Sequence, residues 1–371
     1  MSEQNGRVHI IDFARGTAAL LLVIVHALWM YGSVETQFHA PLGTAIHIVG
    51  QMTAAFLLCM GFSFVITRHS SIGYGIKRAL MILAAGYLLN TLKFIVPISV
   101  FGTMPENFIE AYGWSSPLDS SQLWYLFRTG DILQFAGIAF LIITFVRHYI
   151  SNKWVILALA LLSVLVAEVI RGYRPGITGL DYVADLLWGD QWNVYFPVFP
   201  WISNILVGMF MGMVFLERDK DEQAVYDMSL KLGVGLMAIG VPLILYDWDL
   251  FFRNFFHTGI GGAIYLIGIN LFAFWCVSWM IFKPLKSKAW FMNSMVYLSQ
   301  RVTTIYIIQW TLVCWLMGII GYQTLNSGQL LMLFPFMIAA TLLLDYLLKK
   351  LIDSFSADKS DEQPRDSEKV A

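Results

Sequence analysis

The sequence predicts an all-α polytopic membrane protein, a bundle of about ten transmembrane helices with both termini in the cytoplasm. Two observations carry this prediction. Of the 371 residues, 58% are hydrophobic and only 13% are charged, whereas soluble domains carry about 25% charged residues. Apolar runs of roughly 20 residues, the length that crosses a bilayer core about 30 Å thick, also recur along the whole chain.

The predicted spans follow one another along the chain. They lie near residues 11–32, 44–67, 79–99, 131–146, 154–170, 196–216, 229–247, 260–282, 302–322 and 328–348. The first run is long, ends in aromatic residues and lacks a small-residue cleavage site, so we interpret it as an anchor that stays in the membrane. Two prolines in FPVFPWISN predict a bent start for the sixth span.

The Lys and Arg residues in the connections set the orientation. Sixteen lie at one set of span ends, and five lie at the other: Lys93, Arg128, Arg171, Arg174 and Arg253. The positive-inside rule places the first set, and with it both termini, in the cytoplasm. Residues 1–10 then form a cytoplasmic N-terminus, 11–353 the transmembrane domain and 354–371 a disordered cytoplasmic tail. No Asn-X-Ser/Thr sequence occurs, which fits the plasma (inner) membrane of a bacterium.

Composition and missing motifs argue against several functional classes. No basic patch indicates a nucleic-acid partner. The sequence has no Walker-type phosphate loop, zinc-protease His motif, Gly-X-Ser-X-Gly elbow or Cys-X-X-Cys pair, which disfavours ATP-driven transport, zinc or serine hydrolysis and dithiol chemistry. Cys59, Cys276 and Cys314 fall in apolar runs and are interpreted as packing residues, so no metal site is predicted.

The stretch RGTAALLLVIVHA places a permanent cation and a titratable imidazole in one apolar helix. Arg15 and His26 are eleven residues apart, about three helical turns or roughly 16 Å, so both side chains point to nearly the same face. Ionisable groups inside a membrane usually face an interior cavity and mark function. Structural interpretations stay open: Arg15 with Asp12 as a helix-end anchor, and His26 as a packing histidine.

Further polar residues are candidates for a site. His39 lies in the first outer loop, within FHAPLG, and the larger outer connections are rich in Trp and Tyr, which can stack on a sugar. Within or next to the spans, the candidates are Asp131, Gln134, Asn204, Tyr306 and Gln309. Helix–helix hydrogen bonding explains each of these as well as lining of a site does.

IDFARGTAALLLVIVHA resembles the first span of the transmembrane acyltransferase superfamily, whose acyltransferase-3 branch carries an Arg or Lys, ten residues and then a His. AAFLLCMGFSFVITR and KRALMILAAGYLLN are similar to its next two spans. DILQFAGIAFLI and FPWISNILVGMFMG look more like the branch related to the catalytic domain of heparan-α-glucosaminide N-acetyltransferase. The resemblance extends over roughly residues 7 to 320.

This resemblance implies transfer of an acyl group, commonly acetyl, from cytoplasmic acyl-CoA to a saccharide hydroxyl or amine beyond the membrane. His26 is the implied base. His39 is a rival, because in the heparan-related branch the position matching His26 can be Asn and the working His lies in the following loop. Cations at the cytoplasmic mouth would hold the CoA phosphates: Arg15, Arg68, Lys77 and Arg78. The other five polar candidates would contact the acceptor or the oxyanion.

Two other functions remain open. Ten spans with buried polar residues equally permit a transporter or flippase for a glycan or small solute, which would move its cargo without consuming acyl-CoA. A non-catalytic membrane scaffold with structural histidines is the third interpretation. The expected partners are membrane lipid and, for the acyltransferase, a saccharide or glycoconjugate acceptor.

Overall fold

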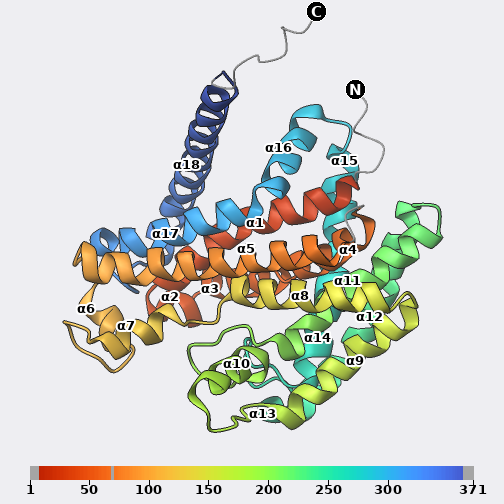
Figure 1. The fold of residues 1–371 in the computed structure, drawn as a ribbon, viewed down its shortest axis with the longest axis horizontal. Helices are drawn as coiled ribbons and strands as arrows, with labels where there is room; N and C mark the ends of the chain where they lie inside the picture. The colour runs from red at the N-terminus through yellow and green to blue at the C-terminus, as the bar shows by residue number, and fades with distance from the viewer. Residues whose placement is uncertain (1–7, 68–70, 362–371) are drawn as a thin grey trace, which may run out of the picture.

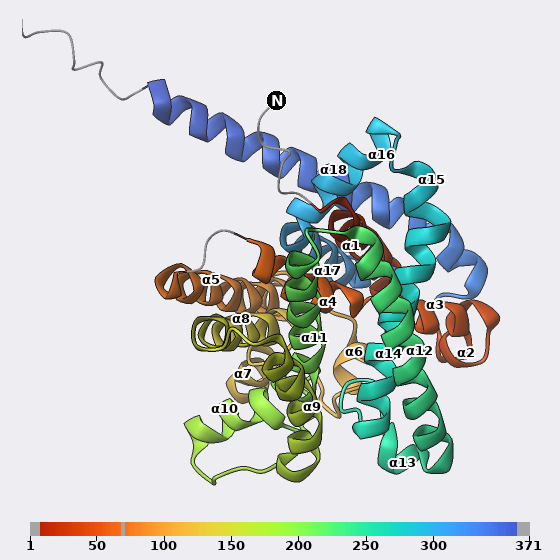
Figure 2. The same cartoon turned by 90° about the vertical axis from the view of Figure 1, so that its right-hand side faces the viewer.

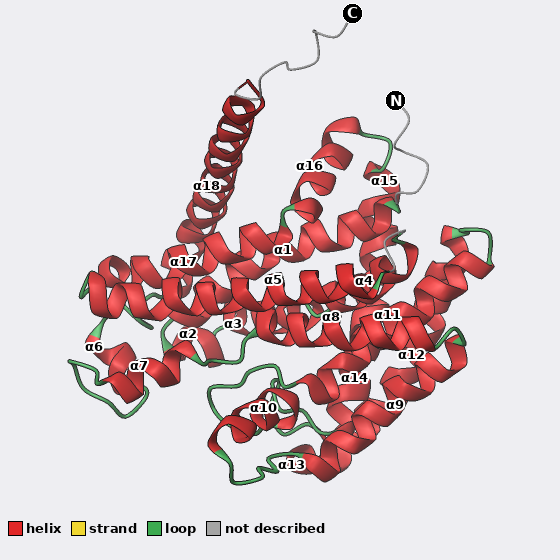
Figure 3. Cartoon of the chain, viewed as in Figure 1, coloured by secondary structure: helices red, strands yellow, loops and turns green. Residues whose placement is uncertain are grey.

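The protein is an all-α polytopic membrane protein. The computed structural model describes residues 8–67 and 71–361, and in these it contains helices, loops and two isolated bridges, with no strand (Figure 3). Ten helical segments are long and apolar enough to cross a membrane, which confirms the predicted number of spans.

The spans are built from single helices or from consecutive helical pieces. They are α1 (His9–Tyr31), α3 (Pro41–Met52) with α4 (Ala55–Ile66), α5 (Ile72–Asn90) with η1 (Thr91–Val100), α8 (Ile132–Tyr149), α9 (Lys153–Ile170), α11 (Val198–Glu217), α12 (Glu222–Tyr246), α14 (Ile260–Val277) with η2 (Ser278–Phe282) and α15 (Lys283–Leu285), α17 (Val302–Ile320) and α18 (Ser327–Asp361).

Short helices gather at one end of the bundle, which we call the loop end. They are α2 (Val34–Phe38), α6 (Glu106–Glu110), α7 (Ser120–Phe127), α10 (Thr178–Trp188) and α13 (Trp248–Phe251) (Figure 1). The opposite end, which we call the basic end, carries α15 and α16 (Ala289–Gln300) together with the start of α1 and the end of α18.

Two hydrophobic clusters hold the bundle together. The α4–α11 cluster includes Leu58, Phe62, Ile205 and Met209, and helices α8, α9, α12 and α14 pack around it. The α1–α17 cluster joins the second half of α1 to α3, α17 and α18. Helix α1 contributes its first turns to the former and its last turns to the latter, and it packs against α3, α4, α16, α17 and α18. It is therefore the central helix (Figure 2).

Helices α4 and α11 cross at a point where neither tolerates a side chain. A Cβ on Gly61 would overlap the carbonyl of Ile205, and one on Gly208 would overlap the carbonyl of Leu58. Small residues that let backbones approach closely are a common basis of helix association in membranes, where packing replaces the hydrophobic effect. This crossing fixes α4, and with it one wall of the cavity described below.

Four spans depart from plain α-helix, one of them the eighth, which contains the π-helix η2. The second is interrupted at Thr53 and Ala54, between α3 and α4, where the predicted span was continuous. The third changes to a π-helix at Thr91, with Pro97 inside it. The sixth has a non-helical residue, Phe199, in its first turn, which confirms the bent start predicted from its prolines.

The last helix is longer than the predicted span. Helix α18 continues to Asp361, so the first residues of the segment predicted to be disordered are helical. Residues 362–371 lie outside the described part of the chain.

Candidate active site

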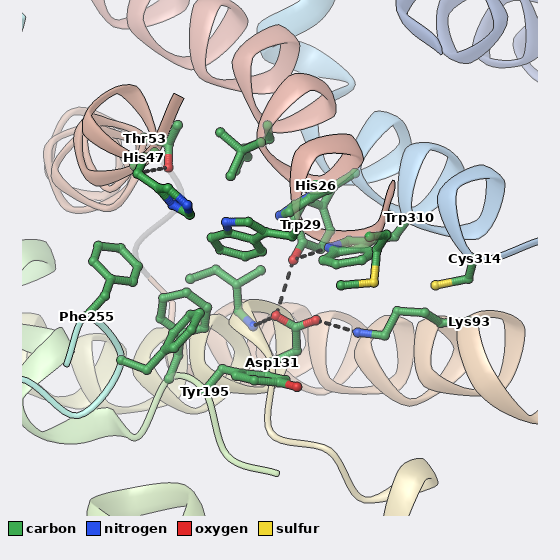
Figure 4. A pocket seen from close by; sticks show the side chains of 18 of the residues that line it. His26, Trp29, His47, Thr53, Lys93, Asp131, Tyr195, Phe255, Trp310 and Cys314 are labelled. Atoms are coloured by element: carbon green, nitrogen blue, oxygen red, sulfur yellow. Dashed lines mark hydrogen bonds and ion pairs between the residues drawn. The ribbon is translucent and has the colours of Figure 1, made fainter. Parts of the chain in front are cut away.

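A cavity of about 490 Å³ lies inside the bundle, lined by residues of both hydrophobic clusters. One face of α1 forms its long wall, with Ala18, Leu22, Val25, His26 and Trp29 at helical spacing. The cavity extends from there to the loop end, where five connections line it: the α2–α3 region and the loops that follow η1, α10, α13 and α17. Figure 4 shows the polar and aromatic side chains that point into it.

His26 is held in this wall by three neighbours. Its Nδ1 lies 2.7 Å from Nε2 and 3.1 Å from Oε1 of Gln309. Its ring stacks on Trp310 with the centroids 4.0 Å apart, and the edge of Tyr306 approaches it at 5.7 Å. Among the described residues no hydrogen bond reaches Nε2. The imidazole is therefore oriented through Nδ1 and leaves Nε2 for chemistry at the cavity.

A chain of polar contacts runs below His26. Trp310 donates from Nε1 to Tyr306 Oη at 2.9 Å, and Tyr306 donates to Oδ1 of Asp131 at 3.2 Å. Lys93 donates to Oδ2 of Asp131 at 2.8 Å, and both side chains are almost fully buried. The Lys93 ammonium also lies 4.6 Å from the centre of the Trp310 ring. Trp310 thus contacts both the imidazole and the ammonium (Figure 4).

Local backbone structure places the two charges. Asp131 is the N-cap of α8: its Oδ1 accepts the amide of Ile132, and Gln134 Oε1 accepts the amide of Asp131 in a capping box. Lys93 sits in the π-helical turn that begins at Thr91. Such turns change the direction of the side chains that follow and are frequent at functional sites. The result is an ion pair that is fully desolvated and hydrogen-bonded on both sides.

The loop end supplies an aromatic wall. Backbone hydrogen bonds between Gly130 and the strand-like segment after α10, Gly130 N to Asn193 O and Tyr195 N to Gly130 O, both 2.7 Å, hold that segment against the start of α8. It brings Trp192, Tyr195 and Phe196 to the cavity, opposite Phe255 and Phe256. Burial raises the pKa of Tyr195 and of neighbouring Tyr112, so both phenols stay protonated and able to donate.

The structure brings together several of the residues predicted as candidates and separates others. His26, Asp131 and Tyr306 line the cavity. Gln309 is hydrogen-bonded to His26, and Gln134 accepts the backbone amide of Asp131. Asn204 is buried in α11 outside the lining, where its Nδ2 is 3.5 Å from the Trp201 carbonyl and its Oδ1 has no partner in the described chain.

The second histidine and the predicted phosphate-binding cations lie elsewhere. His39 is exposed after α2 and does not line the cavity. Arg15 is half-buried on α1, one turn before Ala18, which lines the cavity. Its charge interacts electrostatically with the thiol of Cys59 on α4. Lys77 and Arg78 are exposed in the second turn of α5, and Arg68 lies outside the described residues.

Sequence reasoning missed Lys93, Trp310 and His47 as parts of one site. Lys93 was counted with the loop-end cations, although a single Lys inside a predicted span is itself a signal of function. His47 lines the cavity from α3, stacks on Phe38 at 5.6 Å, and has a buried Nε2 without a hydrogen-bond partner among the described residues. No pattern in the sequence indicates the contact of Trp310 with His26.

This arrangement suits proton transfer to and from a substrate in an internal cavity. It combines an oriented imidazole with one open nitrogen, a neutralised ion pair and phenol donors. Within the described ranges no group of three His, Cys, Asp or Glu side chains is arranged to hold a metal ion.

One comparison with known proteins identifies a family. The family model described as "Heparan-alpha-glucosaminide N-acetyltransferase, catalytic" matches residues 7–248, more than half of the chain. The matched segment contains α1, α5, α8 and α11 and therefore His26, Lys93 and Asp131, while Tyr306, Gln309 and Trp310 lie beyond it. Searches of the curated proteins and of the solved structures give no match.

Proposed function

The chain belongs to the heparan-α-glucosaminide N-acetyltransferase catalytic family, a family of membrane acetyltransferases, and we propose that it transfers an acetyl group from acetyl-CoA to a hydroxyl or amine of a saccharide. The observation that carries the proposal is His26, oriented through Nδ1 by Gln309 with Nε2 open at an internal cavity. A donor on the cytoplasmic side and an acceptor on the far side follow from the distribution of Lys and Arg.

His26 acts as the general base. Its Nε2 accepts the proton of the acceptor O–H or N–H while that oxygen or nitrogen bonds to the thioester carbonyl. The tetrahedral intermediate then expels the CoA sulfur, and the proton on Nε2 passes to it, so the products are the acetylated saccharide and CoA. In the ping-pong alternative the imidazole is acetylated first and the acceptor then attacks the acetyl-imidazole.

The base role requires one tautomer of His26. A base at Nε2 carries its own hydrogen on Nδ1 and donates it to Oε1 of Gln309, 3.1 Å away, in place of accepting from Gln309 Nε2 at 2.7 Å. Stacking on Trp310 fixes the plane of the ring. Tyr306 and Asp131 border the same space. The Tyr306 hydroxyl donates to Asp131 Oδ1, so donation to the thioester oxyanion or the acceptor would require it to leave that carboxylate.

The donor's phosphates are assigned to the basic end. Arg15 precedes the cavity wall by one turn of α1, and the unbroken helix sets it roughly 16 Å from His26 along the axis. Lys77 and Arg78 add positive charge to the same end, and Arg68, outside the described residues, stays a predicted phosphate contact. A phosphate group held at Arg15 leaves the pantetheine arm to run along α1 toward His26, which accounts for the separation of cation and base.

The test is release of CoA and acetylation of a saccharide by purified protein. His26→Ala is expected to lower kcat by about 10²–10⁴-fold, and Gln309→Leu by a smaller factor with KM for the acceptor little changed. His39→Ala, a matched control at an exposed position, is expected to keep wild-type rates. A loss of activity in His39→Ala with retention in His26→Ala would transfer the base role to His39.

The transporter alternative is separated in the same preparation. Movement of a glycan into proteoliposomes without CoA release, unaffected by either histidine substitution, would overturn the acetyltransferase proposal. Thermal stabilisation of the purified protein by CoA supports donor binding, and Arg15→Ala is expected to weaken it.

A further inference from the structure

The cavity contains no charge available to an anionic ligand. Of the residues that line it in the described chain, only Lys93 and Asp131 carry a full charge, and they pair with each other at 2.8 Å. Lys93 also faces the rings of Phe94 and Trp310. Drawing the ammonium toward a sulfate or phosphate would leave the Asp131 carboxylate buried and unpaired, which costs several kcal/mol.

The loop end, which the proposed orientation places on the acceptor's side of the membrane, is acidic. Its described residues include eleven Asp and Glu side chains: Glu35, Glu106, Glu110, Asp119, Asp131, Glu168, Asp181, Asp185, Asp190, Asp247 and Asp249. Against these stand the five cations Lys93, Arg128, Arg171, Arg174 and Arg253. The excess of acidic side chains at the loop end therefore repels polyanions over the range of a Debye length, about 8 Å at physiological ionic strength.

Four of the five loop-end cations are already in ion pairs. Besides Lys93 with Asp131, Arg171 and Arg253 both pair with Glu168, and Arg174 pairs with Asp185. The fifth, Arg128, lies over the rings of Trp124 and Tyr182 and does not line the cavity.

The remaining lining suits an uncharged ring. Aromatic side chains from three loop-end connections face the chamber, among them Tyr112, Tyr195 and Phe255, and uncharged polar groups such as Gln51 and Gln323 lie between them. Aromatic faces pack against the C–H face of a sugar, and amides and phenols bond its hydroxyls. At about 490 Å³ the chamber is within the range of small-ligand sites, roughly 300–1,000 Å³, so it admits the end of a saccharide and not a polymer.

We propose that the part of the acceptor that enters the cavity carries no sulfate, phosphate or carboxylate: the substrate class is a neutral or amino sugar end. This inference rests on the proposed function, since it specifies the acceptor of the same site. It makes that function more specific, because the family match does not distinguish neutral from anionic saccharide acceptors.

The experiment compares one β-glucosaminide with its 6-O-sulfated form. The kcat/KM for acetylation by wild-type protein is expected to be about a hundredfold or more higher for the neutral glycoside, because the sulfate finds no free cation. Gln323→Lys adds an ammonium at the cavity wall and is expected to raise the relative use of the sulfated form about tenfold. Ser115→Lys adds the same charge to an exposed loop-end position outside the lining, and should leave the ratio unchanged.

A binding measurement without acetyl-CoA tests the acceptor inference separately from the proposed function. Trp29, Trp192 and Trp310 line the cavity, so the neutral glycoside is expected to change the intrinsic fluorescence of His26→Ala protein, and the sulfated one is not. Equal binding or equal turnover of the two glycosides, or a preference for the sulfated one, overturns the inference. Selective binding of the neutral glycoside without any CoA release in wild-type protein overturns the proposed function and leaves the inference standing.

Discussion

Two buried ion pairs have the same construction and lie in different parts of the bundle. In one, Asp131 accepts from Lys93 and from the hydroxyl of Tyr306. In the other, Asp345 of α18 accepts from Arg301 Nε at 2.7 and 2.8 Å and from the hydroxyl of Tyr297 at 2.6 Å. Both carboxylates are buried, at 4% and 0% exposure, but the Lys93 side chain is 2% exposed and that of Arg301 is 19% exposed, so desolvation of the cation costs more in the first pair.

The two ion pairs have different surroundings, and this distinguishes their roles. The first pair lines the cavity and connects through Tyr306 to Trp310 and His26. The second joins the α16–α17 junction to α18 and touches no part of the cavity lining. Burial and pairing therefore do not by themselves mark a functional site. What distinguishes Lys93–Asp131 is its contact with an open chamber and with an oriented imidazole.

Removal of one carboxylate is expected to have the largest effect. Asp131→Asn leaves the buried Lys93 ammonium without its counter-charge, which should cost about 3–5 kcal/mol of stability; Asp345→Asn leaves the partly exposed Arg301 and should cost less. Denaturation of the detergent-solubilised proteins measures this. CoA release per folded molecule should be lost only in Asp131→Asn; comparable loss in Asp345→Asn would remove the functional distinction between the pairs.

Replacing both partners of an ion pair with apolar residues is expected to destabilise the protein less than removing the carboxylate alone. It also tests more directly whether the two pairs differ in function. Lys93→Met with Asp131→Leu, and Arg301→Met with Asp345→Leu, remove the desolvation cost along with the attraction, so both proteins should return to within about 2 kcal/mol of wild-type. Activity is expected to return with stability in the Arg301/Asp345 variant and to stay low in the Lys93/Asp131 variant. An active Lys93/Asp131 variant would show that the first pair is structural too.

The mildest test changes a charge at the loop end by pH. His257 donates from Nε2 to the Val194 carbonyl at 2.7 Å and lies 4.0 Å from Asp190. Burial lowers the pKa of His257, against opposing contributions from Asp190 and the Val194 carbonyl, while Arg171 lowers it further. As pH falls below about 6.5, the unfolded chain takes up this proton before the folded one does, so stability should fall.

The His257→Gln variant provides the comparison for this pH effect. It keeps a donor for Val194 but does not titrate, so its melting temperature should fall less between pH 7.5 and 5.5 than that of wild-type protein. His39→Gln, at an exposed histidine, is the control. An identical pH dependence in wild-type and His257→Gln protein would show that folding does not lower the pKa of His257.

The arrangement of the spans follows largely from the sequence, because hydrophobic length is a local property. All ten spans, the bent start of the sixth and the helical α1 that carries both Arg15 and His26 were predictable. The break at Thr53 and Ala54 and the π-helical turn at Thr91 were not. Both depend on how neighbouring helices satisfy the backbone, which no periodicity of side chains records.

The site was predictable residue by residue and not as an assembly. His26, Asp131, Tyr306 and Gln309 stood out because polar groups in apolar runs are costly. Their grouping depends on contacts such as His26 with Gln309, 283 positions apart in the chain, and helix pairing at that distance leaves no mark in one sequence.

The interruption between α3 and α4 has a mechanical consequence. Around it the backbone makes shorter-range hydrogen bonds, Thr53 N to Gly50 O and Phe56 N to Thr53 O, and the Gln51 carbonyl accepts from Asn270 of α14. On one side of the break Ile46 belongs to the α1–α17 cluster, and on the other Leu57 belongs to the α4–α11 cluster. The second span therefore does not behave as one continuous helix. It is two short helices with a hinge between them, and the hinge lies in the cavity wall, where Gly50, Thr53 and Ala54 face the cavity.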